Sequence, residues 1–380
     1  MGAGLVGASL AAALAGSGLR SVVVEPAPPV APGEGWDPRV YAISPGSRDF
    51  LAAAGAWERL DPARVQPVVR MAVAGDAPGA RLDFSADDAA VVALAWIVES
   101  GRLQEALWRR LAEAGGDVRL LAPARCAKLE VDPQRARLEL EDGRSIAAQL
   151  VVGADGAQSW VRRAAGLAAR VEGYGQVGVV ANFACARPHR ATAYQWFRAD
   201  GVLAYLPLPG ERMSMVWSTP DAHAAALLDL DAPSLCRRVA AAGGGALGDL
   251  ELLTPPQGFP LQRLAAESMI GPRVALVGDA AHVVHPLAGQ GVNLGFGDAR
   301  VLAQTLRARG AGEDCGARSL LRRYVRARAE PILAMRAVTH GLVRLFGLPG
   351  ELPARLRNAG LNLTDRLPVL KALLVRHAVG

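Results

Sequence analysis

The chain has 380 residues, of which 51% are hydrophobic and 21% charged, enough apolar content to fill a core and too much for a disordered protein. Its net charge is +6, but all 42 basic residues except Lys128 and Lys371 are arginines, and no basic run is interleaved with aromatics, which argues against a nucleic-acid partner. The four cysteines have no paired spacing, and no apolar run reaches the roughly 18 residues of a membrane span, so we expect no metal, no disulfide framework and a reducing cytoplasm.

The chain opens with the pattern GxGxxG, formed by Gly2, Gly4 and Gly7. An alanine-rich segment with high helix propensity follows over 8–15, and then a short apolar run over 21–24 that ends at Glu25. This order of glycines, helix, strand and acid is typical of a Rossmann unit. We expect Gly2 to make the tight turn, Gly4 to admit a pyrophosphate, Gly7 to allow close packing of the helix, and Glu25 to accept a hydrogen bond from a ribose hydroxyl.

The apolar strand that normally precedes such a glycine pattern is not present, because only Met1 stands before Gly2. That strand is the central one of a Rossmann sheet. We therefore expect the true start of the protein to lie upstream, with Met1 at an internal codon. An in-frame stop codon directly before Met1 would refute this expectation.

A second strand-and-turn signal lies at 148–156, where an apolar run ends in Asp155-Gly156, and Ser159 is placed to cap a following helix. The preceding residues 127–131, 136–141 and 144–147 alternate and predict a small antiparallel meander.

Three further strands are predicted at 192–197, 202–208 and 212–218, and we expect them to form a β-sheet on the substrate side, joined by residues 70–95. Four aromatic residues on these strands are candidates for the substrate pocket, with membership of the core as the alternative: Tyr194, Trp196, Tyr205 and Trp217.

The third signal is a buried strand that ends in Gly278-Asp279, followed by a glycine-rich loop and a long helix from about Phe296. The Asp279 carboxylate can meet a polyol hydroxyl, and the loop at 289–293 brings backbone amides and a helix N-terminus together. Such a junction stabilises negative charge, as on an anionic reduced flavin. His282 and His285 could suggest a metal pair, but no third ligand stands nearby, so we predict no metal.

From Asp298 onward the sequence predicts helices, with Pro331 and Pro353 as breaks. Residues 331–380 hold five of the six net positive charges together with many leucines. This composition suits contact with an anionic membrane surface or a partner, and equally an ordinary helical cap on the main domain.

The three motifs together resemble those of class A flavoprotein monooxygenases, and the chain is similar, nearly end to end, to the ubiquinone-biosynthesis hydroxylase family. The third motif is the most specific of the three, and it contains Pro286, Gly289, Gln290, Gly291 and Asn293. The resemblance implies that Arg39 and Gln104 contact FAD, that Asp279 binds its ribityl chain, and that Asp155-Gly156 serves the FAD phosphates and the docking of the reductant. One departure is Ser100-Gly101, where the family commonly has Asn after the Glu.

The expected fold class is α/β: a Rossmann-type FAD-binding domain with a truncated first strand, an inserted, mainly antiparallel β-sheet domain, and a C-terminal helical segment. We assign residues 1–70, 96–170 and 266–330 to the FAD-binding domain. Residues 71–95 and 171–265 are assigned to the substrate domain, and 331–380 to the helical segment.

The resemblance implies an FAD-dependent monooxygenase that uses NAD(P)H and O2 to hydroxylate a polyprenylated phenol or quinone precursor through a flavin C4a-hydroperoxide. It also suggests a cytoplasmic protein, peripheral on the inner membrane face and part of a ubiquinone-biosynthesis complex. No catalytic base is evident from the sequence.

Three alternatives stay open. A nicotinamide-only dehydrogenase would leave the third motif without a role. Another class A flavoenzyme, such as a reductase, a halogenase or a hydroxylase of small phenols, would share the fold, although a halogenase needs a lysine beside the flavin. A non-catalytic FAD-bound scaffold of a lipid-biosynthesis complex is the third.

Overall fold

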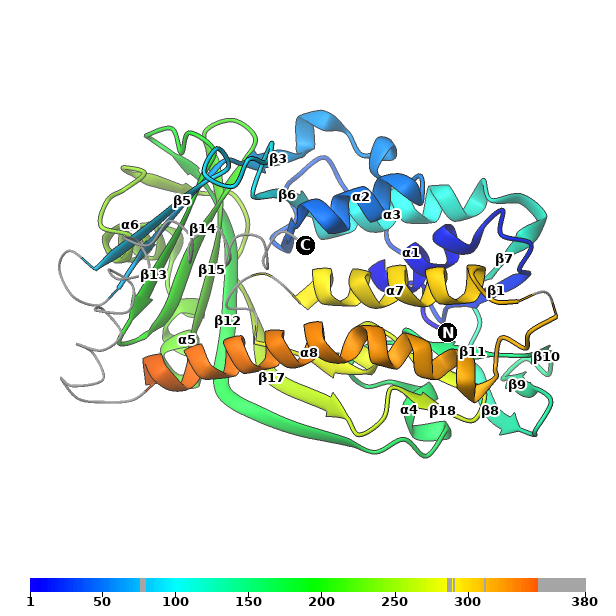
Figure 1. Cartoon of the computed structure of the whole chain (residues 1–380). Helices are drawn as coiled ribbons and strands as arrows, with labels where there is room; N and C mark the ends of the chain where they lie inside the picture. The colour runs from blue at the N-terminus through cyan, green and yellow to red at the C-terminus, as the bar shows by residue number, and fades with distance from the viewer. Residues whose placement is uncertain (76–79, 286–288, 290, 311, 348–380) are drawn as a thin grey trace.

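The computed structural model describes residues 1–75, 80–285, 289, 291–310 and 312–347. Figure 1 shows two parts: a nucleotide-binding half with helices around short parallel strands, and a half built on one large twisted sheet. Two long strands, β12 (Ala169–Cys185) and β17 (Gln257–Ala266), run from one half into the other and pair antiparallel.

The nucleotide-binding half contains two small parallel pairings that flank the first residues of the chain. In one, β1 (Ser21–Val24) pairs with β7 (Val118–Leu121); in the other, β11 (Val151–Gly153) pairs with β19 (Val274–Leu276), which also pairs with β18 (Ile270–Gly271). Gly2 donates to the Val24 carbonyl at 2.9 Å, and the Met1 amino group donates to the Val152 carbonyl at 2.9 Å. The opening dipeptide therefore bridges the two pairings.

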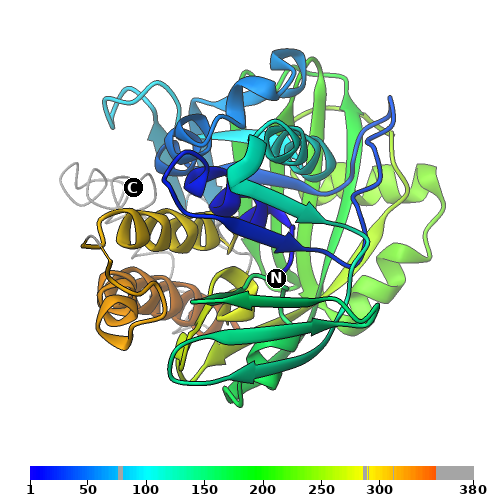
Figure 2. The ribbon, with the colours of Figure 1, turned by 90° about the vertical axis from the view of Figure 1, so that its right-hand side faces the viewer.

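Helix α1 (Leu5–Leu14) follows this bridge at once. Its alanines and leucines favour a helix, and seven of its ten residues are buried. It packs against α3 (Ser100–Ala112) and α7 (Gly291–Arg307) in the largest apolar core of the molecule. Figure 2 shows α7 and α8 (Arg318–Gly347) beside each other on one side of this half.

Smaller elements complete the nucleotide-binding half. They are the sheet β2 (Val40–Ile43), β6 (Ala95–Glu99) and β3 (Gln66–Val68); the meander β8 (Cys126–Val131), β9 (Ala136–Leu140) and β10 (Ser145–Ala148); and the helices α2 (Pro45–Ala53) and α4 (Trp160–Ala164). Short 3-10 turns lie at Trp57–Arg59, Pro62–Arg64, Gly115–Asp117 and Gly278–Ala280. The meander lies where the alternating pattern predicts it.

The large sheet has the strand order β20-β17-β12-β15-β14-β13-β4-β5, with β16 paired to β12. Its remaining strands are β4 (Arg70–Ala74), β5 (Arg81–Ser85), β13 (Thr192–Arg198), β14 (Gly201–Leu208), β15 (Arg212–Pro220), β16 (Leu250–Leu252) and β20 (His282–Val283). All pairings are antiparallel except β4 with β13. Helices α5 (Asp221–Leu228) and α6 (Ala232–Ala242) cover one face of this sheet.

The predicted break at Pro331 does not occur, because α8 continues through this residue. Proline removes one backbone hydrogen bond, here to the carbonyl of Ala327. Both residues lie on the exposed side of the helix, where water can satisfy that carbonyl. The break predicted at Pro353 lies outside the described residues. No helix within the described ranges is long and apolar enough to cross a bilayer.

Candidate active site

The glycine loop before α1 is closely packed at two positions and open at the third. Gly2 has a φ of +86°, and a Cβ there would lie 2.4 Å from the Ala154 carbonyl oxygen. A Cβ on Gly7 would lie 2.1 Å from the Gly2 oxygen, whereas a Cβ on Gly4 would meet no protein atom within 4 Å. The loop is therefore fixed by its neighbours and leaves space only beside Gly4.

The backbone of Ala3, between the first two glycines, is held from both sides. Its amide donates to Oε2 of Glu25 at 2.6 Å. Its carbonyl accepts from the Trp108 indole at 2.8 Å and from the Gln104 amide, both on α3. The structure thus brings together Glu25 and Gln104, two residues singled out in the sequence. Sequence reasoning missed Trp108, which stands one helical turn after Gln104.

The second motif is tied to the third. Oδ2 of Asp155 accepts from the Val161 amide at 3.0 Å, whereas Oδ1 is buried and has no partner among the described groups. Gly156 has a φ of +78°, as a tight turn requires. The Arg162 guanidinium donates to the Ala280 carbonyl at 2.8 Å, so α4 anchors the turn that carries Asp279.

The Gly278-Asp279 turn rests on a buried ionic network that the sequence analysis missed. Oδ2 of Asp298 accepts from the Gly278 amide at 2.9 Å and lies 2.6 Å from His282 Nε2; Oδ1 accepts from the Arg328 guanidinium at 2.7 Å. Asp298 is fully buried on α7, and Arg328 comes from α8. The sequence does contain a signal for this network, because an acid stands on the apolar face of one predicted helix and an arginine on the apolar face of the next helix.

The Asp279 side chain is exposed to solvent, and desolvation by its surroundings raises the pKa of its carboxyl, opposed by the charges of His282 and Arg39. The exposed carboxyl is therefore available to a ligand hydroxyl.

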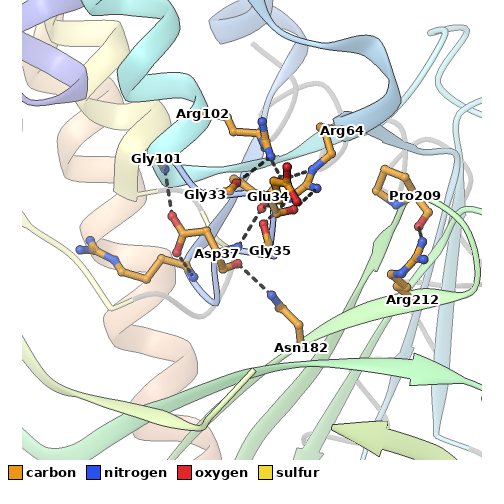
Figure 3. A network of polar contacts seen from close by, with 12 residues as sticks. Gly33, Glu34, Gly35, Asp37, Arg64, Gly101, Arg102, Asn182, Pro209 and Arg212 are labelled. Carbon is orange, nitrogen blue, oxygen red and sulfur yellow. Dashed lines mark hydrogen bonds and ion pairs between the residues drawn. The ribbon is translucent and has the colours of Figure 1, made fainter. Parts of the chain in front are cut away.

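Arg39 follows a tightly held segment. Figure 3 shows Asp37 bound from two sides: its carboxylate accepts from the Gly101 amide at 2.9 Å, and its carbonyl accepts from Asn182 on β12 at 2.8 Å. The Arg39 amide donates to the same carboxylate at 2.8 Å. The Arg39 guanidinium then reaches Tyr41 Oη at 3.1 Å and lies 5.2 Å from the centre of the Phe259 ring.

Glu99 locks this segment to α3. It is 1% exposed and accepts two hydrogen bonds from Arg64, at 2.7 and 2.8 Å, and one from the Asp37 amide at 2.8 Å. At the departure Ser100-Gly101, the contact between α3 and Asp37 is made by the backbone amide of Gly101, so it does not depend on the side chain at this position.

Asn293, in the first turn of α7, clamps this helix to the end of β2. Its Oδ1 accepts from the Ser44 amide at 3.0 Å, and its Nδ2 donates to the Ala42 carbonyl at 2.8 Å. Gly289 has a φ of +60° and lies against Ala42. The N-terminus of α7, beginning at Gly291, is thereby held beside β2. Pro286 and Gln290 lie outside the described residues.

The four aromatic candidates for the substrate pocket lie on the sheet face that α5 and α6 cover. Tyr205 and Trp217 are 1% and 0% exposed, and Tyr194 and Trp196 pack against the same core, which α5 and α6 close. The face toward the nucleotide-binding half carries the alternate residues, among them Asn182, Gln195, Ala204 and Val216. The structure thus places these four side chains on the side of the sheet away from the nucleotide-binding half.

The two histidines of the third motif point to different partners. His285 is 1% exposed, lies 3.0 Å from Gln176 Oε1 through Nε2, and packs edge-on against Tyr174. Burial lowers the pKa of its imidazole to about 4. His282 contacts Asp298 instead. No cluster of three potential metal ligands occurs among the residues described.

The fold and this site define a dinucleotide-binding flavoprotein. Residues 1–339 match the family of the FAD binding domain, and the chain belongs to that family. Its residues fit FAD: the space beside Gly4 admits a pyrophosphate at the N-terminus of α1, and α7, which begins at Gly291, packs against the 3-10 turn that carries Asp279. FAD is the cofactor of this chain.

Two curated relatives match along the whole chain. Ubiquinone hydroxylase UbiL of Rhodospirillum rubrum is 37% identical over 100% of this chain and 88% of its own length. The 3-demethoxyubiquinol 3-hydroxylase of Escherichia coli is 35% identical over 100% and 97%. Among solved structures, PqsL of Pseudomonas aeruginosa, titled a probable FAD-dependent monooxygenase, has a TM-score of 0.76 at 26% identity, covering 96% of this chain and 98% of its own.

The fold alone is shared with p-nitrophenol 4-monooxygenase PnpA of Pseudomonas putida, with a TM-score of 0.81 at 18% identity over 100% of this chain and 97% of that one.

Proposed function

We propose that this protein is an FAD-dependent monooxygenase that hydroxylates the aromatic ring of a polyprenylated phenol in ubiquinone biosynthesis. Two relatives that match the entire chain at 35–37% identity are named as a ubiquinone hydroxylase and a 3-demethoxyubiquinol 3-hydroxylase. The single structural observation that carries the proposal is the Asn293 clamp, which fixes the N-terminus of a 17-residue helix beside Ala42 and Gly289.

The bound cofactor supplies, from its reduced form and O2, the electrophilic oxygen that is transferred to the ring. The protein residues position the cofactor and stabilise its charge. The partial positive charge at the start of α7 favours negative charge on the cofactor ring. Gly4 would admit the pyrophosphate in a loop whose shape Gly2 and Gly7 fix, Glu25 would receive the adenosine ribose, and Asp279 and Arg39 would meet the ribityl and phosphate groups. Gln104 and Trp108 hold the glycine loop through Ala3.

The second motif, Asp155-Gly156, serves the FAD phosphates and the docking of the reductant, which we take to be NAD(P)H. The unpartnered Oδ1 of Asp155 supports a ligand contact there. The aromatic substrate then lies between the Ala42–Gly289 edge and the sheet face that carries Gln195, Ala204 and Val216. This face carries both apolar and polar side chains and is covered by the nucleotide-binding half, which can exclude water from the reacting ring.

The domain assignments made from the sequence remain part of this proposal, with 1–70, 96–170 and 266–330 binding FAD and 71–95 and 171–265 binding the phenol. Association with a membrane or with other enzymes of the pathway follows from the partition of a polyprenylated substrate into lipid. Residues 351–380 would serve that contact, and their removal should weaken liposome binding while leaving flavin content intact.

The decisive experiment is quinone-intermediate profiling in a strain that lacks the gene. We expect a prenylated precursor short of one hydroxyl group to accumulate, and complementation by the wild-type gene to remove it. The purified protein should carry the absorbance spectrum of bound flavin and consume O2 in step with hydroxylated product. A normal ubiquinone profile, or reduction of substrate without O2 uptake, would favour a reductase or a scaffold.

A further inference from the structure

A cavity of about 120 Å³ lies outside the FAD site, between the β12–β17 pair and the second half of α8. Figure 1 shows α8 lying across these two strands. Three arginines from three different elements line the cavity: Arg170 of β12, Arg263 of β17 and Arg336 of α8. Its floor includes Val283 and Val284, which directly precede His285.

The charge of this cavity is unbalanced. Among the described residues that line it, Glu172 is the one acid, and it pairs with Arg263 at 2.9 Å from Nε. Arg170 and Arg336 have no ion pair within the described part of the chain. Three guanidinium groups against one carboxylate leave an excess of two positive charges. This excess matches the charge of a phosphate dianion.

Hydroxyl groups complete the lining. Tyr174 and Thr339 both contribute, but the Thr339 hydroxyl already donates to the Met335 carbonyl within α8, which leaves the Tyr174 hydroxyl to donate to a ligand. Guanidinium groups bind phosphate through paired hydrogen bonds, and a hydroxyl can donate one more. Separate elements hold the three arginines, so the fold has assembled the cluster from residues distant in sequence.

We propose that this cavity is a phosphate-binding site distinct from the FAD site. The phosphate can belong to a soluble nucleotide or to a phospholipid headgroup. Leu333, about one helical turn before Arg336 on α8, is 68% exposed and can enter a lipid surface, so both sources must be tested.

The test uses the full-length FAD-loaded protein and inorganic phosphate as the probe, titrated by calorimetry at constant ionic strength with sodium chloride as the balance. The double variant Arg170→Gln/Arg336→Gln should bind phosphate at least about tenfold more weakly, because charge-assisted hydrogen bonds are lost. Arg326→Gln is the matched control: it removes the same charge from an exposed position on α8 and should leave the affinity unchanged.

Glu172→Gln provides a variant in which the affinity for phosphate should rise instead of fall. It removes the competing carboxylate, so phosphate should bind about threefold or more tightly, a gain that misfolding cannot produce. Equal phosphate affinity in the wild type, the double variant and Glu172→Gln would overturn the proposal. Unchanged flavin content and circular dichroism establish that each variant is folded.

Two further arms identify the source. Binding of NADP⁺ in preference to NAD⁺, lost in the double variant, assigns the site to a nucleotide. Sedimentation with phosphatidylglycerol vesicles but not phosphatidylcholine vesicles, lost in the same variant, assigns it to a lipid headgroup. Phosphate binding without either response assigns it to the free anion.

Discussion

Nε2 of His282 lies 2.6 Å from Oδ2 of Asp298, and the two side chains are only 4% and 0% exposed. The same carboxylate binds the Gly278 amide and the Arg328 guanidinium. One buried acid thus joins the turn that carries Asp279, the helix α7 and the helix α8. The geometry of the cofactor turn depends on it.

Replacing Asp298 with Ala should therefore destabilise the protein. The change leaves the Arg328 charge buried without a partner, and breaking such a pair costs about 3–5 kcal/mol. Chemical denaturation should report this loss, together with a lower flavin content. Asp49→Ala is the control, since the Asp49 side chain is 71% exposed and its pair with Arg48 is a surface one. Equal stability of the two variants would contradict the role given to the network.

Replacing glycine by alanine should have different effects at two positions of the glycine loop, Gly4 and Gly7. Gly4→Ala places a methyl group where no protein atom lies within 4 Å, so the stability of the FAD-free protein should change by less than about 1 kcal/mol. FAD affinity should fall about tenfold or more, because the methyl group occupies the pyrophosphate position.

Gly7→Ala, in contrast, should lower stability even without FAD, because its Cβ would lie 2.1 Å from the Gly2 oxygen. Thermal melting of the FAD-free proteins and fluorescence titration with FAD separate the two effects. If Gly4→Ala bound FAD as the wild type does, the cofactor could not lie beside that residue.

Tyr205→Phe tests which face of the sheet receives the substrate. The Tyr205 hydroxyl donates to the Val239 carbonyl inside the core beneath α6, so its removal should cost about 1 kcal/mol of stability. The KM for the phenol should not change, because the side chain lies on the far face. Steady-state kinetics with a several-fold rise in KM and unaltered stability would return Tyr205 to the substrate pocket.

His285 predicts a pH dependence of stability. Burial holds the pKa of its imidazole at about 4 in the folded protein, below the ordinary 6.5. Between these two pH values the unfolded chain binds the additional proton, so stability falls as the pH is lowered from 6.5 to 4. The full effect is roughly 3 kcal/mol. Its contribution is fully present above pH 6.5.

Urea unfolding of wild type and His285→Asn at several pH values from 7.5 to 4 measures this effect. The wild type should lose more stability than the variant as the pH falls, with the difference confined to that window. A difference between the two proteins that is the same at every pH would mean that the imidazole does not titrate as its burial requires.

The cofactor motifs are predictable from the amino-acid sequence, because each is a local pattern with a local cause. Gly2 and Gly156 stand where the backbone needs a positive φ, Ser159 caps α4, and alternation defines the strands of the meander and of β13–β15. These features depend on neighbours a few residues away, and the sequence contains those neighbours.

Which face of the large sheet meets the cofactor domain depends on long-range packing and cannot be predicted from the strand sequences. Both faces are buried, one by α5 and α6 and the other by the nucleotide-binding half, so alternation separates two sets of residues without saying which set faces the site. The same holds for Asp298 with Arg328 and for the three arginines of the cavity. Their partners come from distant segments, and only the packing of helices and strands brings such charges together.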